Sequence, residues 1–454
     1  MVTTTTDPRP LPRVVVAAPA SGHGKTTIAT GLLAALRRRG LTVSPHKVGP
    51  DYIDPGYHAL AAGRPGRNLD PFLVGAERIA GLLRHGASVP TPADIAVVEG
   101  VMGLHDGAVG RRDYASTAHV ARLIEAPVLL VLDTTAQGRS AAALTLGMAA
   151  FDPAVRIGGV ILNRVGSPRH ETLLRDALAE VGVPVLGAVT RAAEVAAPAR
   201  HLGLVPVAER APESLAIVTA LAELVDATVD LDAVLDLART AAPLTTPAWD
   251  PVTAVGGPAG AERPVVALAG GPAFTFSYAE TAELLTAAGA HVVTVDPLRD
   301  PALPAGTRAV VIGGGFPEAY AQALAGNTML RAELADFDGP IVAECAGLLY
   351  LGRSLDDVPM CGRLDLTARM TGRLTLGYRE AVAVTDSPVA RAGEPVRGHE
   401  FHRTTTDPGH GDRPAWRWND AEHGFVSGRV HASYLHTHWA GHPDAARRLV
   451  EACR

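Results

Sequence analysis

Residues 13–40 read RVVVAAPASGHGKTTIATGLLAALRRRG, and this stretch decides the fold class of the chain. It opens on an apolar run typical of a buried strand, turns through a glycine-rich segment and continues as a helical pattern. Strand, glycine-rich turn and helix in this order are the context of a phosphate-binding loop. In such a loop the backbone N–H groups and the helix N-terminus face an anion. The stretch therefore predicts an α/β domain that binds ATP or GTP.

The loop keeps the Gly-Lys-Thr end of the usual pattern but has Pro19 where the first glycine normally stands. We expect Lys25 to reach the β- and γ-phosphates and the Thr26 hydroxyl to bind Mg²⁺. Ala20 occupies the position at which partitioning-type ATPases carry an additional lysine, which argues against that group. The predicted ATP-binding residues of the loop are Ser21, Gly22, His23, Gly24, Lys25, Thr26 and Thr27.

The first half of the chain alternates short apolar runs with helical patterns. The predicted strands are 13–18, 93–100, 126–133, 156–163 and 184–189, and helical patterns cover 27–40, 141–151 and 170–182. Continuous Val, Ile and Leu runs are typical of strands buried on both faces. We therefore predict a doubly wound parallel sheet over residues 13–240, preceded by a disordered tail at 1–12.

Acidic side chains follow two of the strand-like segments of this half. VGPDYIDPGYH spans 48–58 and VVEGVMGLHDG spans 97–107. Ligands of open α/β sheets bind at the carboxyl ends of strands, so Asp51, Asp54, Glu99 and Asp106 are candidates for a Mg²⁺ site. We expect Thr26, Asp51 and Glu99 to hold the metal, while Asp54, which precedes a proline, could equally cap a helix.

A further polar residue, Asn163, ends the strand in ILNRV (161–165). Its amide could pair with an adenine edge, and it could equally cap a turn. We include it among the predicted ATP-binding residues.

A change of composition separates the two halves of the chain. Residues 241–262 are rich in Pro, Ala, Thr and Gly and predict a linker. Strand-like runs then resume at 264–272, 291–298, 308–315 and 339–347. We therefore predict a second α/β domain over 263–454.

Cys345 lies where an apolar strand runs into a helix, in IVAECAGLLYL (341–351). A sharp strand-to-helix turn exposes a nucleophile, and we expect the helix N-terminus to lower the pKa of the thiol. His436 is the candidate base, and the N–H groups of Gly314, Gly315 and Ala346 are candidates to bind glutamine or an oxyanion. A cysteine without such a sequence context is more often a buried core residue, and this is the interpretation that we keep for Cys361 and Cys453.

Composition excludes several classes of protein. The formal net charge is −6 with mixed signs, which argues against nucleic-acid binding. Three widely spaced cysteines predict neither a disulfide framework nor a zinc site, and they fit a reducing cytoplasm. The N-terminus lacks the apolar core of a signal peptide, and no apolar stretch is long enough to span a membrane. The sequence leaves the oligomeric state open, and a homodimer is one state that it allows.

Long motifs in both halves resemble the cobyrinate and hydrogenobyrinate a,c-diamide synthases, which are glutamine-dependent amidotransferases of cobalamin biosynthesis. The resemblance covers nearly the whole chain. It depends on SGHGKTT, KVGPDYIDP, VVEGVMGLHDG and ILNRV in the first half, and on GGGFPE, AECAGL, GHEFH and ASYLHTH in the second. It implies a dethiobiotin-synthetase-like ATP domain joined to a class I glutamine amidotransferase domain.

The resemblance also implies residue roles. Cys345 is the nucleophile and His436 its activating histidine, while His438 stands where the usual glutamate would be. The group that orients His436 is left open. Arg111 and Arg112 could meet substrate carboxylates or form a solvated basic turn. Matched positions near the substrate are Asp51, Tyr52, Ile53 and Asp106.

The implied reaction uses ATP, Mg²⁺ and glutamine. Ammonia released at Cys345 would pass through a closed passage to a carboxylate activated as an acyl phosphate, namely the a and c acetates of cobyrinic or hydrogenobyrinic acid. One alternative is an amidotransferase of another tetrapyrrole, such as a nickel-sirohydrochlorin a,c-diamide synthase or cobyric acid synthase. A second is a non-catalytic nucleotide switch that binds proteins or membranes.

Overall fold

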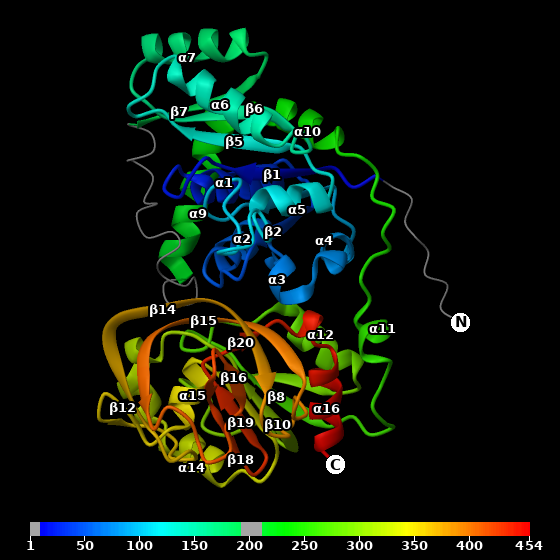
Figure 1. Ribbon diagram of the computed structural model, residues 1–454, viewed down its shortest axis with the longest axis vertical. Helices are drawn as coiled ribbons and strands as arrows, with labels where there is room; N and C mark the ends of the chain where they lie inside the picture. The colour runs from blue at the N-terminus through cyan, green and yellow to red at the C-terminus, as the bar shows by residue number, and fades with distance from the viewer. Residues whose placement is uncertain (1–9, 192–210) are drawn as a thin grey trace. The chain divides into compact units, whose positions relative to one another are not determined.

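The computed structural model of the chain describes residues 10–191 and 211–454 (Figure 1). The chain divides into two compact units, Met1–Trp249 and Asp250–Arg454. Most of the expected tail, residues 1–9, lies outside the described residues. The hydrogen bonds between β1 and β4 begin one residue before Arg13, because the Ala96 N–H donates to the Pro12 carbonyl. No helix within the described ranges is both long and apolar enough to cross a bilayer.

The first unit is built on one parallel sheet of seven strands. All five predicted strands are confirmed. The strand-like segment that leads into VGPDYIDPGYH is β2, and the sheet also contains β3, which was not predicted. Across the sheet the order is β3 (Arg67–Leu69), β2 (Val43–Val48), β4 (Ile95–Glu99), β1 (Arg13–Ala17), β5 (Val128–Asp133), β6 (Ile157–Val165) and β7 (Val185–Thr190).

Connections lead in both directions from β1, which is paired with β4 on one side and β5 on the other. Right-handed crossovers that run in opposite directions lie on opposite faces, so helices cover both faces of the sheet. Contacts agree, because α1 packs with α2 and α9, α4 with α5, and α6 with α7. The helices are α1 (Lys25–Arg38), α2 (Asp54–Ala62), α3 (Pro71–Val74), α4 (Ile79–Ser88), α5 (Thr117–Leu123), α6 (Ser140–Phe151), α7 (Pro168–Glu180), α9 (Ala211–Thr228) and α10 (Leu231–Arg239).

The predicted linker, 241–262, is more ordered than its composition suggests. Its first part packs on the first unit, where Arg84 donates to the Leu244 and Thr246 carbonyls. Asp250 then accepts N–H groups at the start of a short helix, α11 (Pro251–Val255). Proline at the first helical position and an aspartate cap before it favour this helix.

The second unit contains a mainly parallel sheet and confirms the four strands predicted there. The order is β18 (Phe425–Ser427), β19 (Val430–Ser433), β11 (Ile341–Glu344), β10 (Thr307–Ile312), β8 (Val265–Ala269) and β9 (His291–Val295), and only β18 is antiparallel to its neighbour. Besides α11, the helices of this unit are α12 (Ala279–Ala287), α13 (Ala321–Gly326), α14 (Thr328–Asp336), α15 (Ala346–Leu351) and α16 (Asp444–Ala452).

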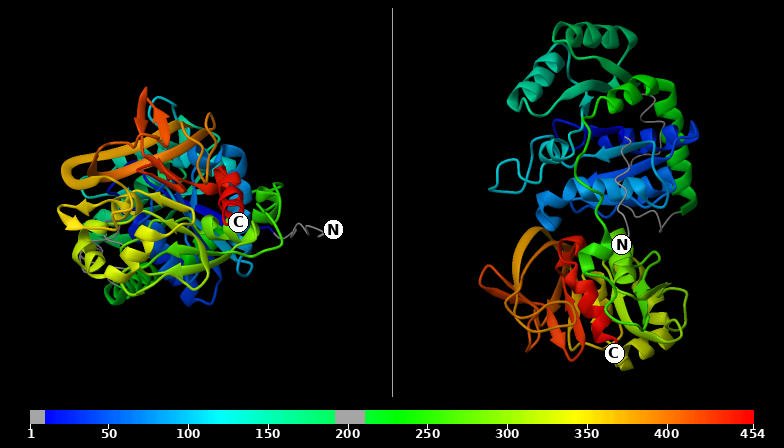
Figure 2. Two further views of the ribbon diagram at one scale, coloured as in Figure 1. Left: turned by 90° about the horizontal axis from the view of Figure 1, so that it is seen from below. Right: turned by 90° about the vertical axis from the view of Figure 1, so that its right-hand side faces the viewer.

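A second, largely antiparallel sheet of this unit was not predicted. Its longest strands are β14 (Thr367–Ala383) and β15 (Pro395–Asp407), which form the long orange hairpin of Figures 1 and 2. The β15 strand also pairs with β20 (His436–Thr437), which brings the GHEFH motif beside His436. The remaining strands are β12 (Ser354–Leu355), β13 (Val358–Pro359), β16 (Trp416–Trp418) and β17 (Ala421–His423).

Close packing of α1 against α9 depends on Gly31. A Cβ placed there would lie 2.4 Å from Val225 Cγ2 and 2.8 Å from the Leu221 carbonyl oxygen. We expect Gly31→Ala to lower the free energy of unfolding by about 1–3 kcal/mol, because the helices must separate. The measurement is the urea midpoint of the full chain.

Gly147 is the matched control, because it is an exposed helix position with nothing within 4 Å of an added Cβ. Alanine there should stabilise by roughly 0.5–1 kcal/mol through helix propensity. Equal effects of the two substitutions would contradict the packing role of Gly31.

Candidate active site

The phosphate-binding loop connects β1 to α1 at the carboxyl edge of the first sheet. Gly22 and Gly24 have φ angles of 82° and 96°, which favour glycine. A Cβ on Gly24 would also lie 2.3 Å from Asn163 Nδ2. Asn163 is buried, and its amide donates to the His23 carbonyl at 3.0 Å. The Asn163 amide is thus bonded to the loop backbone in this structure, so this N–H is not available to pair with an adenine base.

Lys25 lies folded across the loop. Its Nζ donates to the Ala20 carbonyl at 3.1 Å and to the Met102 carbonyl at 2.5 Å. Burial, together with the nearby charge of Lys47, lowers the pKa of Lys25 to about 8. Carbonyl oxygens are weak partners for an ammonium, so a phosphate oxygen can replace them at little cost.

A buried ionic cluster lies beside the first turn of α1. Lys47 Nζ contacts Asp54 Oδ2 at 2.6 Å and Glu99 Oε1 at 2.9 Å. The Thr26 hydroxyl donates to Glu99 Oε1 at 2.6 Å and lies 3.4 Å from Asp54 Oδ2. His58 Nε2 lies 2.6 Å from the other Glu99 oxygen. We call Thr26, Lys47, Asp54, His58 and Glu99 the edge cluster.

Charges within the edge cluster affect the pKa values of its two carboxyl groups differently. Burial alone would raise the pKa of Glu99, but Lys47 and His58 hold it well below its usual range. Burial and the neighbouring Glu99 charge raise the pKa of Asp54 to about 6. Glu99 is therefore a fixed anion, while Asp54 is the carboxyl group that changes charge near neutral pH.

The edge cluster differs from the predicted metal set of Thr26, Asp51 and Glu99. Asp51 Oδ1 accepts the N–H groups of Ile53 and Asp54 at 2.7 and 3.0 Å, so it caps the turn before α2. Asp54, for which a capping role was an open alternative, instead contacts Thr26. Of the two aspartates, the structure thus places Asp54 against Thr26 and Asp51 in the cap of the turn before α2. The metal-binding role of either aspartate stays a prediction.

The edge cluster fits a hard divalent cation. Asp54 Oδ1 is buried and makes no hydrogen bond, although an anionic oxygen in such a place requires a partner. It belongs to the carboxylate that contacts the Thr26 hydroxyl, and hydroxyl and carboxylate oxygens are the ligands that Mg²⁺ prefers. The described parts of the chain contain no group of three His, Cys, Asp or Glu side chains able to hold a metal alone. Phosphate oxygens and water would have to complete the coordination.

The other predicted residues of this unit lie around the same edge. Asp106 Oδ2 accepts the Gly103 N–H at 2.9 Å and so shapes the turn after β4. Ile53 is buried and Tyr52 partly exposed, while Ser21 is exposed and Thr27 buried. The Arg111 guanidinium lies 5.5 Å from the centre of the Phe72 ring, and Arg112 is exposed.

In the second unit, Cys345 occupies the predicted turn between β11 and α15. Its φ of 51° and ψ of −103° are strained for a residue with a side chain. Its N–H donates to the Ser433 carbonyl at 2.8 Å, and the following Gly347 N–H donates to the Gly313 carbonyl at 3.1 Å. These bonds hold the turn between two neighbouring strands, β19 and β10.

The expected lowering of the thiol pKa is wrong for this state of the protein. Burial raises the pKa of Cys345 to about 12, and the carboxylates of Glu318, Glu344 and Glu400 add to the effect. A hydrogen bond from the Ala346 N–H works in the opposite direction but is smaller. Burial likewise lowers the pKa of His436 to about 3. In this state the Cys345 thiol and the His436 imidazole are therefore both neutral.

Cys345 lines a pocket with about 450 Å³ of space not filled by protein atoms. Gly315 and Phe276 also line it. A Cβ on Gly314 would lie 2.4 Å from His436 Cε1 and 3.0 Å from the Phe276 ring. The glycine turn, the aromatic ring and His436 are thus in mutual contact beside the thiol pocket.

Charged groups that the sequence did not single out complete this pocket. Glu400 on β15 pairs with Arg379 Nε at 2.6 Å and lies 3.5 Å from His402 Nε2. His402 and Glu318 line the pocket itself. The motifs GHEFH and GGGFPE contain these residues, but only the pairing of β14 with β15 brings Arg379 to them. Cys361 and Cys453 are buried elsewhere, and all three cysteines are free.

Comparisons with known proteins agree with this geometry. Residues 14–205 match the CobQ/CobB/MinD/ParA nucleotide binding domain, and residues 265–444 match the CobB/CobQ-like glutamine amidotransferase domain. The chain is 58% identical to hydrogenobyrinate a,c-diamide synthase of Streptomyces coelicolor over 98% of each chain. It belongs to the a,c-diamide synthase family.

Other members of the family support the same assignment. Hydrogenobyrinate a,c-diamide synthase of Thermobifida fusca is 57% identical over 97% of each chain. Cobyrinate a,c-diamide synthase of a Synechococcus strain is 41% identical over 97% of this chain and 98% of its own.

Removal of Lys47 would leave two carboxylates buried without their cation. We expect Lys47→Met to lower the free energy of unfolding by about 3–5 kcal/mol at neutral pH. The difference in unfolding free energy between the variant and the unmodified protein should become smaller below pH 6, because Asp54 can then take up a proton. Urea unfolding at several pH values measures both effects.

Arg39→Met is the control, because Arg39 forms an exposed ion pair with Asp232. It should cost less than about 1 kcal/mol at any pH. A similar small, pH-independent loss for Lys47→Met would contradict the role assigned to the edge cluster.

Proposed function

We propose that the chain is an ATP- and glutamine-dependent ligase that amidates the a and c acetate carboxylates of hydrogenobyrinic acid. The observation that carries the proposal is the presence of two distinct sites in one family member. One unit has a lysine-bearing phosphate loop beside the edge cluster. The other has a strained cysteine in a pocket lined by Gly315 and Phe276, with His436 close to Gly314 and Phe276. A nucleotide switch has no need of the second site, so we set that alternative aside.

In the glutaminase half, Cys345 attacks the side-chain amide of glutamine. Because the resting thiol is neutral, a base must take its proton as the bond forms, and we assign this role to His436. N–H groups of Gly315 and Ala346 would stabilise the oxyanion, and His436 would return the proton to the departing ammonia. Water then hydrolyses the thioester to glutamate. Glu318 and Arg403 offer opposite charges to the amino and carboxylate groups of glutamine in this pocket.

In the synthetase half, the substrate carboxylate attacks the γ-phosphate of ATP. Lys25 would exchange its two carbonyl partners for phosphate oxygens and offset the charge that develops during transfer. Ammonia then displaces phosphate from the acyl phosphate and gives the amide. Asp106, Tyr52 and Ile53 follow the strands that end at this edge, and we assign them to the corrinoid side of the site.

We assign Mg²⁺ to Thr26, Asp54 and Glu99, on the strength of the unpartnered Asp54 oxygen. A bound Mg²⁺ would neutralise charge on the ATP phosphates. Lys47 holds both carboxylates in place for it.

The relatives favour the metal-free corrin as substrate. Those named for hydrogenobyrinate are 54–58% identical to this chain, whereas those named for cobyrinate are 41–43% identical. Incubation with hydrogenobyrinic or cobyrinic acid, followed by mass spectrometry of the amides, tests the choice. A clear preference for the cobalt-containing acid would overturn it.

Cys345→Ala should abolish glutamine as nitrogen donor and leave amide formation from ammonium within about twofold, because only the thiol releases nitrogen from glutamine. The measurement compares amide yield with each donor. Cys361→Ala removes a different buried thiol and should keep both activities. Glutamine-dependent synthesis by the Cys345 variant is the result that would falsify the assignment.

Asp54→Asn should raise the Mg²⁺ concentration for half-maximal ammonium-dependent synthesis about tenfold or more, because it removes a charged ligand. Asp51→Asn keeps an oxygen acceptor for the turn and should change this concentration less than about threefold. A titration of activity against Mg²⁺ distinguishes the two. The reverse order of effects would restore the sequence-based metal set.

A further inference from the structure

The third catalytic group of the glutaminase site is open, because His438 stands where a glutamate would orient the active histidine. We propose that Glu344, the residue before the nucleophile, is the positioning residue that holds His436 through its Nδ1. The inference rests on the proposed glutaminase function and deepens it. A histidine that serves a thiol through Nε2 needs a partner at Nδ1 to fix its tautomer and ring orientation.

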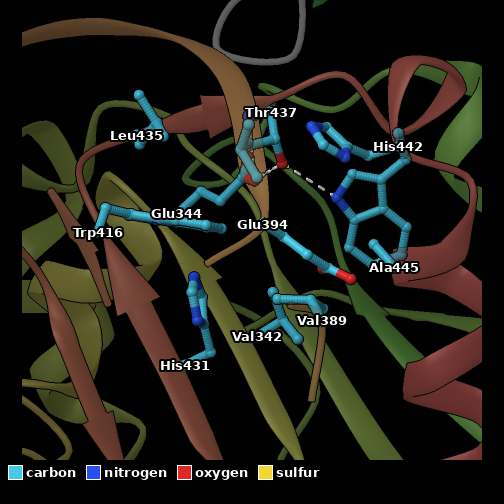
Figure 3. Close-up of a pocket in the computed structure, with 12 residues that line it drawn as sticks. Val342, Glu344, Val389, Glu394, Trp416, His431, Leu435, Thr437, His442 and Ala445 are labelled. Atoms are coloured by element: carbon cyan, nitrogen blue, oxygen red, sulfur yellow. Dashed lines mark hydrogen bonds between the residues drawn. The ribbon is translucent and has the colours of Figure 1, made fainter. Parts of the chain in front are cut away.

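The geometry of Glu344 fits this role. Its Oε2 lies 3.9 Å from His436 Nδ1. Its other oxygen is already fixed, since Oε1 accepts the Thr437 N–H at 3.1 Å and the Thr437 hydroxyl at 2.7 Å. The indole of Trp439 donates in turn to that hydroxyl at 3.2 Å, and Figure 3 shows both side-chain bonds as dashed lines. One carboxylate oxygen is anchored, and the other faces the imidazole.

The distance of 3.9 Å is too long for a hydrogen bond but suits a catalytic pair at rest. Such bonds often tighten only when substrate binds and charge develops. When His436 accepts the thiol proton it becomes a buried cation, and a buried cation requires an anion nearby. Glu344 is partly buried at the end of β11, and its partner Thr437 directly follows the histidine, so the fold keeps the two groups together.

His438, the alternative, is already engaged elsewhere. Its Nδ1 accepts the Ala440 N–H at 3.3 Å, and its Nε2 lies 3.8 Å from Glu280 Oε2. Its ring stacks on Tyr278 at a centroid distance of 4.0 Å. The His438 ring nitrogens thus face the Ala440 N–H and the Glu280 carboxylate.

Other ionisable groups face Glu344 from the elements around it. His431 of β19, His442 and Glu394 line the same pocket, which has about 390 Å³ of unfilled space (Figure 3). Arg448 of α16 pairs with Glu394. Burial raises the pKa of Glu344 to about 7, so its carboxylate form gains population as the pH rises through neutrality. Burial lowers the pKa of His431 to about 4, which leaves that histidine neutral over this range.

The test is steady-state glutaminase kinetics of Glu344→Gln. A glutamine side chain at position 344 can keep the hydrogen bonds to Thr437 but carries no charge to balance an imidazolium. We therefore expect kcat to fall about 10- to 100-fold, while the KM for the substrate glutamine stays within about threefold. In the unmodified enzyme, kcat should rise with pH near 7 as Glu344 loses its proton. This rise should be absent from Glu344→Gln. Glu344→Asp should recover part of kcat, and ammonium-dependent synthesis should be unchanged in all variants.

Glu280→Gln is the matched control, because it alters the buried carboxylate beside His438. It should keep kcat within about threefold. Loss of activity in Glu280→Gln but not in Glu344→Gln would overturn the proposal, as would a Glu344→Gln enzyme with an unchanged kcat and pH profile. If Cys345→Ala also retained glutamine use, the proposed function itself would fail, which separates the two outcomes.

Discussion

The ion pairs of Lys47 with Asp54 and Glu99 are the interaction on which the nucleotide site depends. Parallel strands end at one edge of their sheet, so residues that follow β1, β2 and β4 meet there. Two carboxylates in a buried position would repel each other and lose their hydration. Lys47, on β2 between them, makes their proximity tolerable and leaves one Asp54 oxygen unpartnered. The same balance of charge that stabilises this edge also prepares it for a cation.

Much of the fold follows from local sequence patterns, and the exceptions have physical reasons. The apolar runs that became β1, β4 to β7, β8, β10 and β11 are largely buried, and their composition alone predicts them. The edge strand β9 is mostly exposed, but its run of valines still predicts a strand. The β2 strand contains Pro45, His46 and Lys47, which interrupt an apolar signal, although all three are buried. The hairpin of β14 and β15 is largely exposed along β14, so its alternation of polar and apolar residues is weak.

Site residues were predictable where one motif contains the whole arrangement. The phosphate loop and the turn around Cys345 are of this kind. Asp51 and Asp54 could not be ranked from sequence, because both are acids near a strand end and only the turn geometry assigns one as a cap. Glu344 meets Thr437 across 93 positions, so nothing local marks it. The state of charge of Cys345 also could not be predicted, since burial outweighs the helix N-terminus.

The neutral Cys345 has a consequence for the life of the enzyme between turnovers. Peroxide and other electrophiles react with thiolates far faster than with thiols, and repeated oxidation ends in sulfur acids that are not reversed. A sulfur that gives up its proton only when its own amide substrate is aligned is shielded from such chance reactions. The raised pKa of Cys345 thus lowers the reactivity of the resting thiol and protects it from oxidation.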